Sequence, residues 1–151
     1  MSKIKPNKIW IDADACPKAV KETVFKASRR LKIKVVLVAN TYQVIPYGEL
    51  IQLIVVDKGE DMADKYIIDQ AEAHDLVVTA DIPLAAKVVK KKAVGLNPRG
   101  EIYTEENVGG ILSMRNFMKD LRDEGAITSG PPPFGPKDIQ QFANSLNKLL
   151  S

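Results

Sequence analysis

Short apolar segments alternate with segments of helical periodicity along the first 103 residues, and this alternation restricts the fold more than any other feature. The apolar segments, each with the length of a buried strand, span residues 8–12, 33–38, 51–56, 76–79 and 93–96. Helices are predicted to begin after Pro17, near Asp61 and at Pro83, because proline is well tolerated in the first turn of a helix. Strands that are separated by single helices form parallel sheets through βαβ crossovers. The sequence therefore predicts a three-layer α/β fold with a mainly parallel, five-stranded sheet.

The last third of the chain has a different pattern and is predicted to be helical. A helix is expected over residues 104–124, with Thr104 as its N-cap. Its buried stripe is predicted to consist of Ile111, Met114, Met118 and Leu121. The Gly- and Pro-rich segment 125–136 precedes a last helix, whose apolar stripe consists of Ile139, Phe142, Leu146 and Leu149. Since one short helix cannot bury a core alone, we expect a single domain, 1–151, with a core over 1–103 and a C-terminal helical appendage over 104–151.

The composition is that of a globular protein rather than of a fibrous or disordered chain. Hydrophobic residues make up 45% of the 151 residues and charged residues 27%, which excludes collagen-like and wholly disordered classes. The net charge is only +3, so charge alone neither requires nor excludes nucleic acid as a partner. The single cysteine, the polar N-terminus and the lack of an apolar run of membrane-spanning length predict a cytoplasmic protein with neither a disulfide framework nor a membrane partner.

Aspartates follow three of the predicted strands. Those after the first, third and fourth strands are, in chain order, Asp12 and Asp14; Asp57, Asp61 and Asp64; and Asp81. If the strand order is 3-2-1-4-5, the first and fourth strands flank the crevice in which open α/β sheets bind ligands. The order 2-1-3-4-5 would instead bring the first and second groups together. Residues two apart in an extended chain point to the same side, so Asp12 and Asp14 are expected to act together.

A cluster of carboxylates requires either protons or a cation. Two carboxylates about 4 Å apart repel by roughly 4 kcal/mol at an effective dielectric constant near 20, and additional ones raise the cost further. Oxygen ligands suit Mg²⁺ or Mn²⁺ better than zinc. We therefore predict that Asp12, Asp14, Asp64 and Asp81 hold such an ion. A bound divalent ion can polarise a phosphoryl oxygen and lower the pKa of bound water, which indicates phosphoester chemistry.

Several of these acids also have a simple structural interpretation. Asp61 and Asp64 suit the first turn of a helix, as an N-cap and as a favourable charge at its positive end. Asp81 suits the N-cap position of the helix that Pro83 opens. Asp75 is predicted to be a solvent-facing or capping residue. These interpretations need no metal.

Three further residues are predicted to bind substrate. Asn40 follows the second strand, and Lys87 and Arg99 lie in a stretch, 84–100, that contains no acidic residue. Beside an acidic metal site, such cations can hold the phosphates of a polyanion, although a solvated helix face is the simpler interpretation. Cys16 has no neighbouring base in the sequence and is predicted to be a small buried thiol rather than a nucleophile.

Five motifs, in order along the chain, carry a family resemblance. They are IDADACP at 11–17, GEDMAD at 59–64, TADIPLA at 79–85, NPRG at 97–100 and GPPPF at 130–134. Together they resemble the YaiI/YqxD family of uncharacterised bacterial proteins, which is similar to the PIN-like nuclease superfamily. This resemblance implies the strand order 3-2-1-4-5 and a Mg²⁺ or Mn²⁺ site. Carried onto this chain, the implied ligands are Asp12, Asp61 or Asp64, and Asp81, with Asp14 as an added acid.

Three functions are consistent with these features. The first is a metal-dependent nuclease, acting on RNA rather than DNA, in which Asp12, Asp14 and Asp81 hold the metal and Asp61 or Asp64 completes its shell or orients water. The second is an aspartyl phosphatase resembling the haloacid-dehalogenase superfamily, with Asp12 as nucleophile and Asp14 as general acid. The third is a non-catalytic RNA-binding module.

Overall fold

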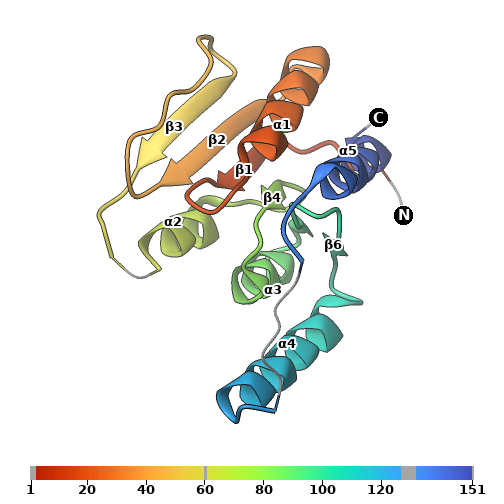
Figure 1. The fold of residues 1–151 in the computed structure, drawn as a ribbon. Coiled ribbons are helices and arrows are strands. Elements are labelled where there is room, and N and C mark those ends of the chain that lie inside the picture. Colours follow the sequence, from red (N-terminus) through yellow and green to blue (C-terminus); the bar gives the residue numbers. More distant parts are fainter. Residues whose placement is uncertain (1–2, 60, 127–131, 151) are drawn as a thin grey trace.

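Six strands and five helices make up the computed structural model, which describes residues 3–59, 61–126 and 132–150 (Figure 1). The strands are β1 (Lys8–Asp12), β2 (Lys34–Ala39), β3 (Ile51–Val55), β4 (Leu76–Val78), β5 (Val94–Leu96) and β6 (Ile102–Tyr103). The helices are α1 (Lys18–Leu31), α2 (Met62–Gln70), α3 (Ile82–Lys90), α4 (Val108–Asp123) and α5 (Pro136–Leu150). Within these described residues, no helix has both the length and the apolar character needed to cross a membrane. Parts of the predicted segment 125–136 and of the motif at 130–134 lie outside the described residues.

The strands form one sheet in the order β3-β2-β1-β4-β5-β6. The first five strands are parallel, and β6 pairs antiparallel with β5. The predicted α/β class and the order 3-2-1-4-5 are therefore confirmed, and the order 2-1-3-4-5 is wrong. The edge strand β6 is not predicted, because two residues are too few to carry a periodic pattern. The chain winds outward from β1 to β3 and then crosses back to β4, so the winding direction reverses between β1 and β4.

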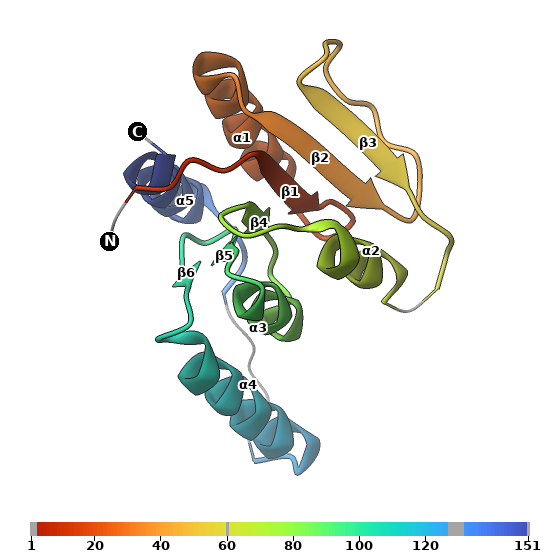
Figure 2. The ribbon, with the colours of Figure 1, turned by 180° about the vertical axis from the view of Figure 1, so that it is seen from behind.

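Helices cover both faces of the sheet, as Figures 1 and 2 show together. On the face covered by α1 and α5, Ile9 and Ile11 of β1 belong to the same buried cluster as Phe142 of α5. On the face covered by α2 and α3, Trp10 belongs to the same buried cluster as Ile67 of α2. Neighbouring residues of β1 thus serve opposite layers, as an extended chain requires. The three-layer arrangement follows from this alternation.

The two C-terminal helices pack differently. α5 lies against α1 and buries Phe142, Leu146 and Leu149, in agreement with the predicted stripe. α4 lies against α3 on the outer side of the molecule (Figure 2) and buries Val108 near its start. Met114 is 58% exposed, so the predicted burial of this position is wrong. The reason is that α4 contacts α3 rather than the sheet, which leaves much of its apolar stripe uncovered.

α4 also begins later than the sequence predicts. Asn107, not Thr104, occupies its N-cap position. The Asn107 side chain accepts a hydrogen bond from the Thr104 backbone N–H at 2.8 Å and donates to the Ile102 carbonyl at 2.7 Å. This local turn over residues 104–107 competes with the helix, as short amide side chains commonly do.

The motif at 97–100 connects the sheet to α5. Arg99 pairs with Asp138 at 3.1 Å, and the Ser145 hydroxyl donates to the Gly100 carbonyl at 2.6 Å. Gly100 has a φ of +98°, and a Cβ there would lie 2.7 Å from the backbone carbonyl oxygen of Gln141. Only glycine permits this conformation and this close approach. The motif therefore has a structural explanation, namely the attachment of the last helix.

Asp75 is buried rather than solvent-facing, contrary to one of the two predicted interpretations. Its side chain is 1% exposed and lies at the edge of the sheet where β1 and β4 begin. Its carboxylate accepts hydrogen bonds from the Trp10 indole N–H at 3.0 Å and from the backbone N–H groups of Lys8 and Glu72 at 3.2 and 3.0 Å. It thus ties the first strand to the chain that precedes β4.

Candidate functional site

Three aspartates from separate elements meet at the edge of the sheet where the strands end. Asp12 is the last residue of β1, and Asp81 follows β4 as the N-cap of α3. Asp64 lies in the first turn of α2 and interacts electrostatically with both of them. β1 and β4 are parallel neighbours, so their carboxyl ends lie together where the winding reverses, which is the usual ligand-binding position in open α/β sheets. We call Asp12, Asp64 and Asp81 the carboxylate rim.

A buried threonine positions two members of the carboxylate rim. The Thr79 hydroxyl, on a residue that is 1% exposed, donates to Asp12 Oδ2 at 3.0 Å and accepts from the Asp81 backbone N–H at 3.0 Å. Asp81 Oδ1 in turn accepts from the Leu84 backbone N–H at 3.0 Å, which confirms its predicted role as an N-cap. The pKa of Asp12 is raised, mainly by burial and further by the charges of Asp81 and Asp14, although the hydrogen bond from Thr79 opposes this rise. Sequence reasoning did not identify Thr79 as a positioning residue.

Asp64 is the most strongly perturbed acid of the carboxylate rim. Burial, followed by the negative charges of Asp81 and Asp12, raises the pKa of Asp64 to about 7. A side-chain hydrogen bond with Asp81 and the charge of Asp61 raise this pKa further. The raised pKa of Asp64 thus reflects the crowding of carboxylates at this point of the fold. A divalent cation can relieve the repulsion between these carboxylates.

Asp64 should make the stability of the metal-free protein depend on pH. Its pKa is about 7 in the folded protein, above its ordinary value of 3.8. The folded state binds more protons than the unfolded state between these values, so the free energy of unfolding falls as the pH rises through this window. We expect Asp64→Asn to reduce this fall, leaving the part that the raised pKa of Asp12 contributes, and to be more stable than the wild type at alkaline pH by about 1 kcal/mol, allowing for solvent screening. Urea unfolding in EDTA across this pH range measures the effect.

The matched control for this measurement is Asp57→Asn, which removes an exposed carboxylate beyond β3. The control should keep the pH dependence of the wild type. Parallel stability curves for Asp64→Asn and the wild type would contradict the raised pKa of Asp64.

Asp14 acts electrostatically on Asp12, but its carboxylate also makes contacts away from the carboxylate rim. β1 ends at Asp12 and the backbone turns over residues 13–16, so the two-residue repeat of an extended strand does not reach Asp14. The Asp14 carboxylate accepts from the Asn40 backbone N–H at 2.7 Å and from Gln43 Nε2 at 3.4 Å. Asp14 therefore holds the loop after β2. Within the described residues, the side-chain oxygen of Asn40 is buried without a hydrogen-bond partner.

A pocket of about 320 Å³ lies beside the carboxylate rim. Its walls come from α2, α3 and α4 and consist of Asp61, Asp64, Lys65, Ile68, Asp81, Pro83, Leu84, Lys87 and Arg115. Asp61 and Asp64 line the same pocket, although Asp61 makes no side-chain capping bond at the start of α2. Lys87 lies beside the acids, where its predicted phosphate-binding role requires it. Arg115 is a residue that sequence reasoning missed, because only the packing of α4 on α3 brings it there.

Three other cations near Lys87 in the sequence do not line this pocket and are engaged by other groups. Lys91 Nζ donates to the Ile68 carbonyl at 2.6 Å, and Lys92 pairs with Glu105 at 2.7 Å. Arg99, predicted to bind substrate, holds the start of α5 as described above. Of the predicted substrate-binding cations, Lys87 is thus the one that lines the acidic pocket.

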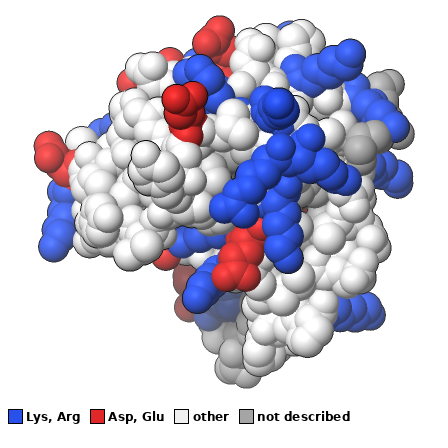
Figure 3. Space-filling view, turned by 90° about the horizontal axis from the view of Figure 1, so that it is seen from above, with Lys and Arg blue, Asp and Glu red and all other residues white. Residues whose placement is uncertain are grey.

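Positive charge gathers at the opposite edge of the sheet, where the strands begin. Figure 3 looks onto the end of the molecule at which α1 ends and β2 begins, and Lys and Arg side chains cluster in the middle of this view. The last turn of α1 carries Arg29 and Arg30, and Lys32 and Lys34 follow as exposed residues. This basic end thus lies away from the carboxylate rim, at the other end of the strands.

Cys16 lies next to the carboxylate rim but has the properties of an inert thiol. Its Sγ donates to the Pro17 carbonyl at 3.7 Å. Burial raises the pKa of Cys16 to about 12, against the lowering effect of the charge of Lys21. Since the thiolate is the reactive form, the structure favours the predicted structural role.

The chemistry of the carboxylate rim fits a hard divalent ion, although the side chains do not form a ready-made cage. Over residues 3–59, 61–126 and 132–150, no group of three or more His, Cys, Asp or Glu side chains is arranged to hold a metal. The predicted ligands Asp12, Asp14, Asp64 and Asp81 therefore do not form a preassembled cage among these residues, and the Asp14 carboxylate accepts hydrogen bonds from Asn40 and Gln43. Mg²⁺, however, keeps several waters and takes only one or two protein carboxylates together with substrate phosphates. Asp64 and Asp81, which line the same pocket, have the oxygen donors that such a site needs.

Comparison with known proteins identifies a family for the chain. The model of a family described as "Uncharacterized BCR, YaiI/YqxD family" matches residues 10–151. UPF0178 proteins of Maridesulfovibrio salexigens and Pseudoalteromonas atlantica are 57% and 52% identical to this chain, over 143 and 144 residues. These matches cover 95% of this chain, and 95% and 98% of the two relatives. No solved structure matches the chain. As its five motifs predict, the chain belongs to the YaiI/YqxD family.

Proposed function

We propose that this protein is a Mg²⁺- or Mn²⁺-dependent nuclease that hydrolyses phosphodiester bonds, with RNA rather than DNA as its substrate. One observation carries this proposal. Asp12, Asp64 and Asp81 come from three separate elements and interact at the point where the winding of the sheet reverses, with the pKa of Asp64 raised to about 7. Acids that serve only as helix caps do not need to be brought together in this way. The strand order also agrees with that of the PIN-like nucleases that the sequence resembles.

The residues of the site have distinct roles in this proposal. Asp64 and Asp81 hold the ion, which when bound polarises the phosphoryl oxygen and acidifies water. Asp12, fixed by Thr79, accepts a proton from the attacking water as the water oxygen bonds to phosphorus. The bond to the ribose oxygen breaks with its electron pair on that oxygen, which a solvent water then protonates. Lys87, whose side chain lines the adjoining pocket, offsets the negative charge on the phosphate.

The two alternative functions receive less support from the geometry. An aspartyl phosphatase needs Asp14 as the general acid beside Asp12, but the Asp14 carboxylate is engaged by Asn40 and Gln43. A non-catalytic RNA-binding module does not account for the crowding of Asp12, Asp64 and Asp81 that raises the pKa of Asp64. The cleavage assay below separates this last alternative from a nuclease.

We also propose that the protein works in the cytoplasm. Cys16 is a free thiol in the structure, and a reducing compartment preserves such a thiol. Fractionation of cells that express the full chain tests this location.

Metal binding should stabilise the folded protein through the carboxylate rim. At an ion concentration about 100 times the Kd, binding contributes about 2.7 kcal/mol, which corresponds to an increase of about 5–10 °C in the Tm of a chain of this size. We expect millimolar Mn²⁺ to produce such an increase in the wild type and no increase in Asp81→Asn. Asn is as good an N-cap as Asp, so this substitution removes the charge without removing the cap of α3. Differential scanning calorimetry with and without Mn²⁺ measures the effect.

Cleavage of a labelled RNA, and of a DNA of the same sequence, tests the reaction itself. Asp57→Asn, with the same loss of charge outside the carboxylate rim, should keep both the Mn²⁺ effect and the cleavage. An equal rise in Tm for Asp81→Asn and the wild type would remove Asp81 from the metal site. RNA binding without cleavage in Mn²⁺ would instead identify a non-catalytic module.

A further inference from the structure

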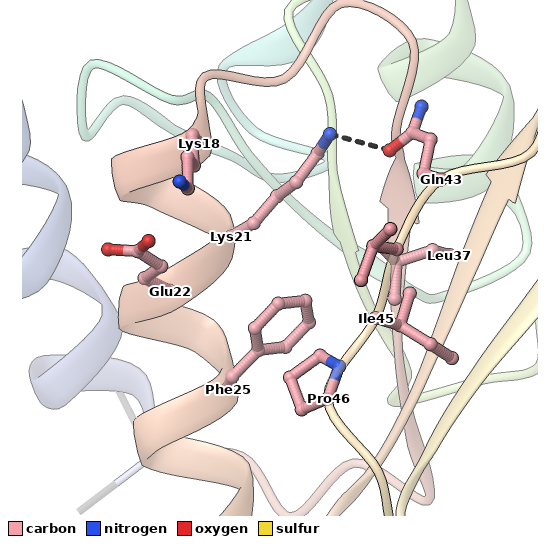
Figure 4. A pocket seen from close by; sticks show the side chains of 9 residues that line it. Lys18, Lys21, Glu22, Phe25, Leu37, Gln43, Ile45 and Pro46 are labelled. Carbon is pink, nitrogen blue, oxygen red and sulfur yellow. Dashed lines mark hydrogen bonds between the residues drawn. The ribbon is translucent and has the colours of Figure 1, made fainter.

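Another pocket lies between α1 and the loop that connects β2 to β3, and it has a volume of about 490 Å³ (Figure 4). Its walls combine apolar and polar side chains, namely Lys18, Lys21, Glu22, Phe25, Leu37, Gln43, Val44, Ile45 and Pro46. Figure 4 shows the Phe25 ring facing Pro46, with Leu37 and Ile45 beside them. Lys18 and Lys21 extend from the first turns of α1 above this apolar floor. The pocket therefore offers an apolar surface for a flat group and positive charge at one end.

A short series of hydrogen bonds runs from this pocket to Asp14, which follows β1. Lys21 Nζ donates to Gln43 Oε1 at 2.7 Å, and Gln43 Nε2 donates to Asp14 Oδ1 at 3.4 Å. Lys21 and Asp12 both act electrostatically on the thiol of Cys16. The cationic end of the pocket thus faces the edge of the sheet at which the strands end.

The loop beside the pocket carries an exposed apolar surface. Within the described residues, six large hydrophobic side chains are exposed, and three of them, Tyr42, Val44 and Tyr47, belong to this loop. Tyr42 is 78% exposed, and nothing in its own fold covers it. Exposed apolar patches on soluble proteins commonly mark binding sites.

We propose that this pocket binds an unpaired base of a single-stranded RNA, while Lys18 and Lys21 hold its neighbouring phosphates. The inference rests on the proposed nuclease function and specifies its substrate as single-stranded. A base has two apolar faces and a polar edge, and the pocket has an apolar floor with the amide of Gln43 and the carboxylate of Glu22 at its border. Single-strand binding proteins use the same combination of aromatic surface and positive charge. Paired bases in a duplex cannot enter such a pocket, because their faces are stacked on their neighbours.

Binding of a labelled RNA of about 12 nucleotides, within the usual range of single-strand site sizes, tests the proposal. Fluorescence anisotropy in EDTA measures binding without cleavage and compares the single strand with a blunt duplex of the same sequence. We expect the wild type to bind the single strand at least tenfold more tightly than the duplex. The binding constant K falls with salt, and each lost phosphate contact makes the slope of log K against log salt shallower by about 0.7 for single strands. The double variant Lys18→Gln/Lys21→Gln should therefore make this slope shallower by about 1.4.

The matched control is Lys119→Gln/Lys148→Gln, which removes two exposed cations on α4 and α5 and should leave the slope unchanged. Tyr42→Ala, at an exposed position, should weaken binding at least about fivefold if a base stacks there. Circular dichroism confirms that each variant is folded.

Three results would overturn the proposal. They are equal affinity for the single strand and the duplex, an unchanged slope in the pocket variant, and self-association through this loop in place of RNA binding, detected by light scattering. Because the binding assay contains EDTA, it does not depend on the metal effect. If the pocket variants bind RNA as the wild type does, the pocket proposal is wrong but the nuclease proposal still stands. If Mn²⁺ does not raise the Tm of the wild type, the metal site is wrong but the RNA-binding result in EDTA still holds.

Discussion

Replacing Asp12 with Asn is expected to reduce the rate of RNA cleavage in Mn²⁺ by about a thousandfold, the usual scale for loss of one essential group in a preorganised site. Asn retains an oxygen that accepts the hydrogen bond from the Thr79 hydroxyl, so the side chain stays in place. It cannot take a proton from water, because a neutral amide is not a base at this pH. Single-turnover cleavage of a labelled oligonucleotide measures the chemical step separately from product release.

The stability of this variant distinguishes loss of chemistry from loss of fold. Burial and the neighbouring acids raise the pKa of Asp12, so its charge disfavours the folded state and Asp12→Asn should be at least as stable as the wild type in EDTA. Asp14→Asn should keep most of the activity, since Asp14 holds the loop after β2 rather than the reacting groups. Full activity in Asp12→Asn, or an equal loss in Asp14→Asn, would contradict these assignments.

The fold could be predicted largely because its determinants are local. Asp61 and Pro83 mark helix starts within one or two residues of the observed ones, and βαβ units admit few sheet orders. What could not be predicted depends on competing local contacts. Asn107 forms a turn that delays the start of α4, and Met114 stays exposed because α4 packs on another helix instead of on the sheet.

The candidate site was predictable to the extent that it depends on strand ends. Asp12 and Asp81 follow strands that are neighbours in the sheet, so topology alone brings them to one edge. Strand alternation does not place Asp14, because the strand ends one residue after Ile11 and the backbone then turns; its charge nevertheless acts on Asp12. Arg115 had no signal in the sequence, since a helix about 100 residues from β1 reaches the pocket only through tertiary packing. Sequence reasoning therefore finds acids at strand ends more readily than it finds the cations that accompany them.

At the opposite edge of the sheet, Asp75→Ala is expected to be the most destabilising of the substitutions considered, by about 3–5 kcal/mol. The buried carboxylate accepts three hydrogen bonds, from the Trp10 indole and from the backbone of Lys8 and Glu72. Removing it leaves the buried Trp10 donor and two part-buried backbone donors without their acceptor, and each unsatisfied buried donor costs about 1–3 kcal/mol. Asp69→Ala, at an exposed position on α2, should change stability by less than about 0.5 kcal/mol. Urea unfolding followed by circular dichroism measures both variants.

The indole contact can be isolated by a double-mutant cycle. Trp10→Phe removes the N–H donor while keeping an aromatic ring in the buried cluster against α2, so it should cost less in the Asp75→Ala background than in the wild type. A coupling of about 1–3 kcal/mol is typical of hydrogen-bonded neighbours. Additive effects would show that the Trp10 ring contributes through packing alone. The carboxylate rim lies at the other end of β1, so the Mn²⁺ effect on Tm should persist in Asp75→Ala under conditions in which it is folded. This result would show that the hydrogen bonds of Asp75, which fix the start of β1, contribute to stability independently of the carboxylate rim at the end of β1.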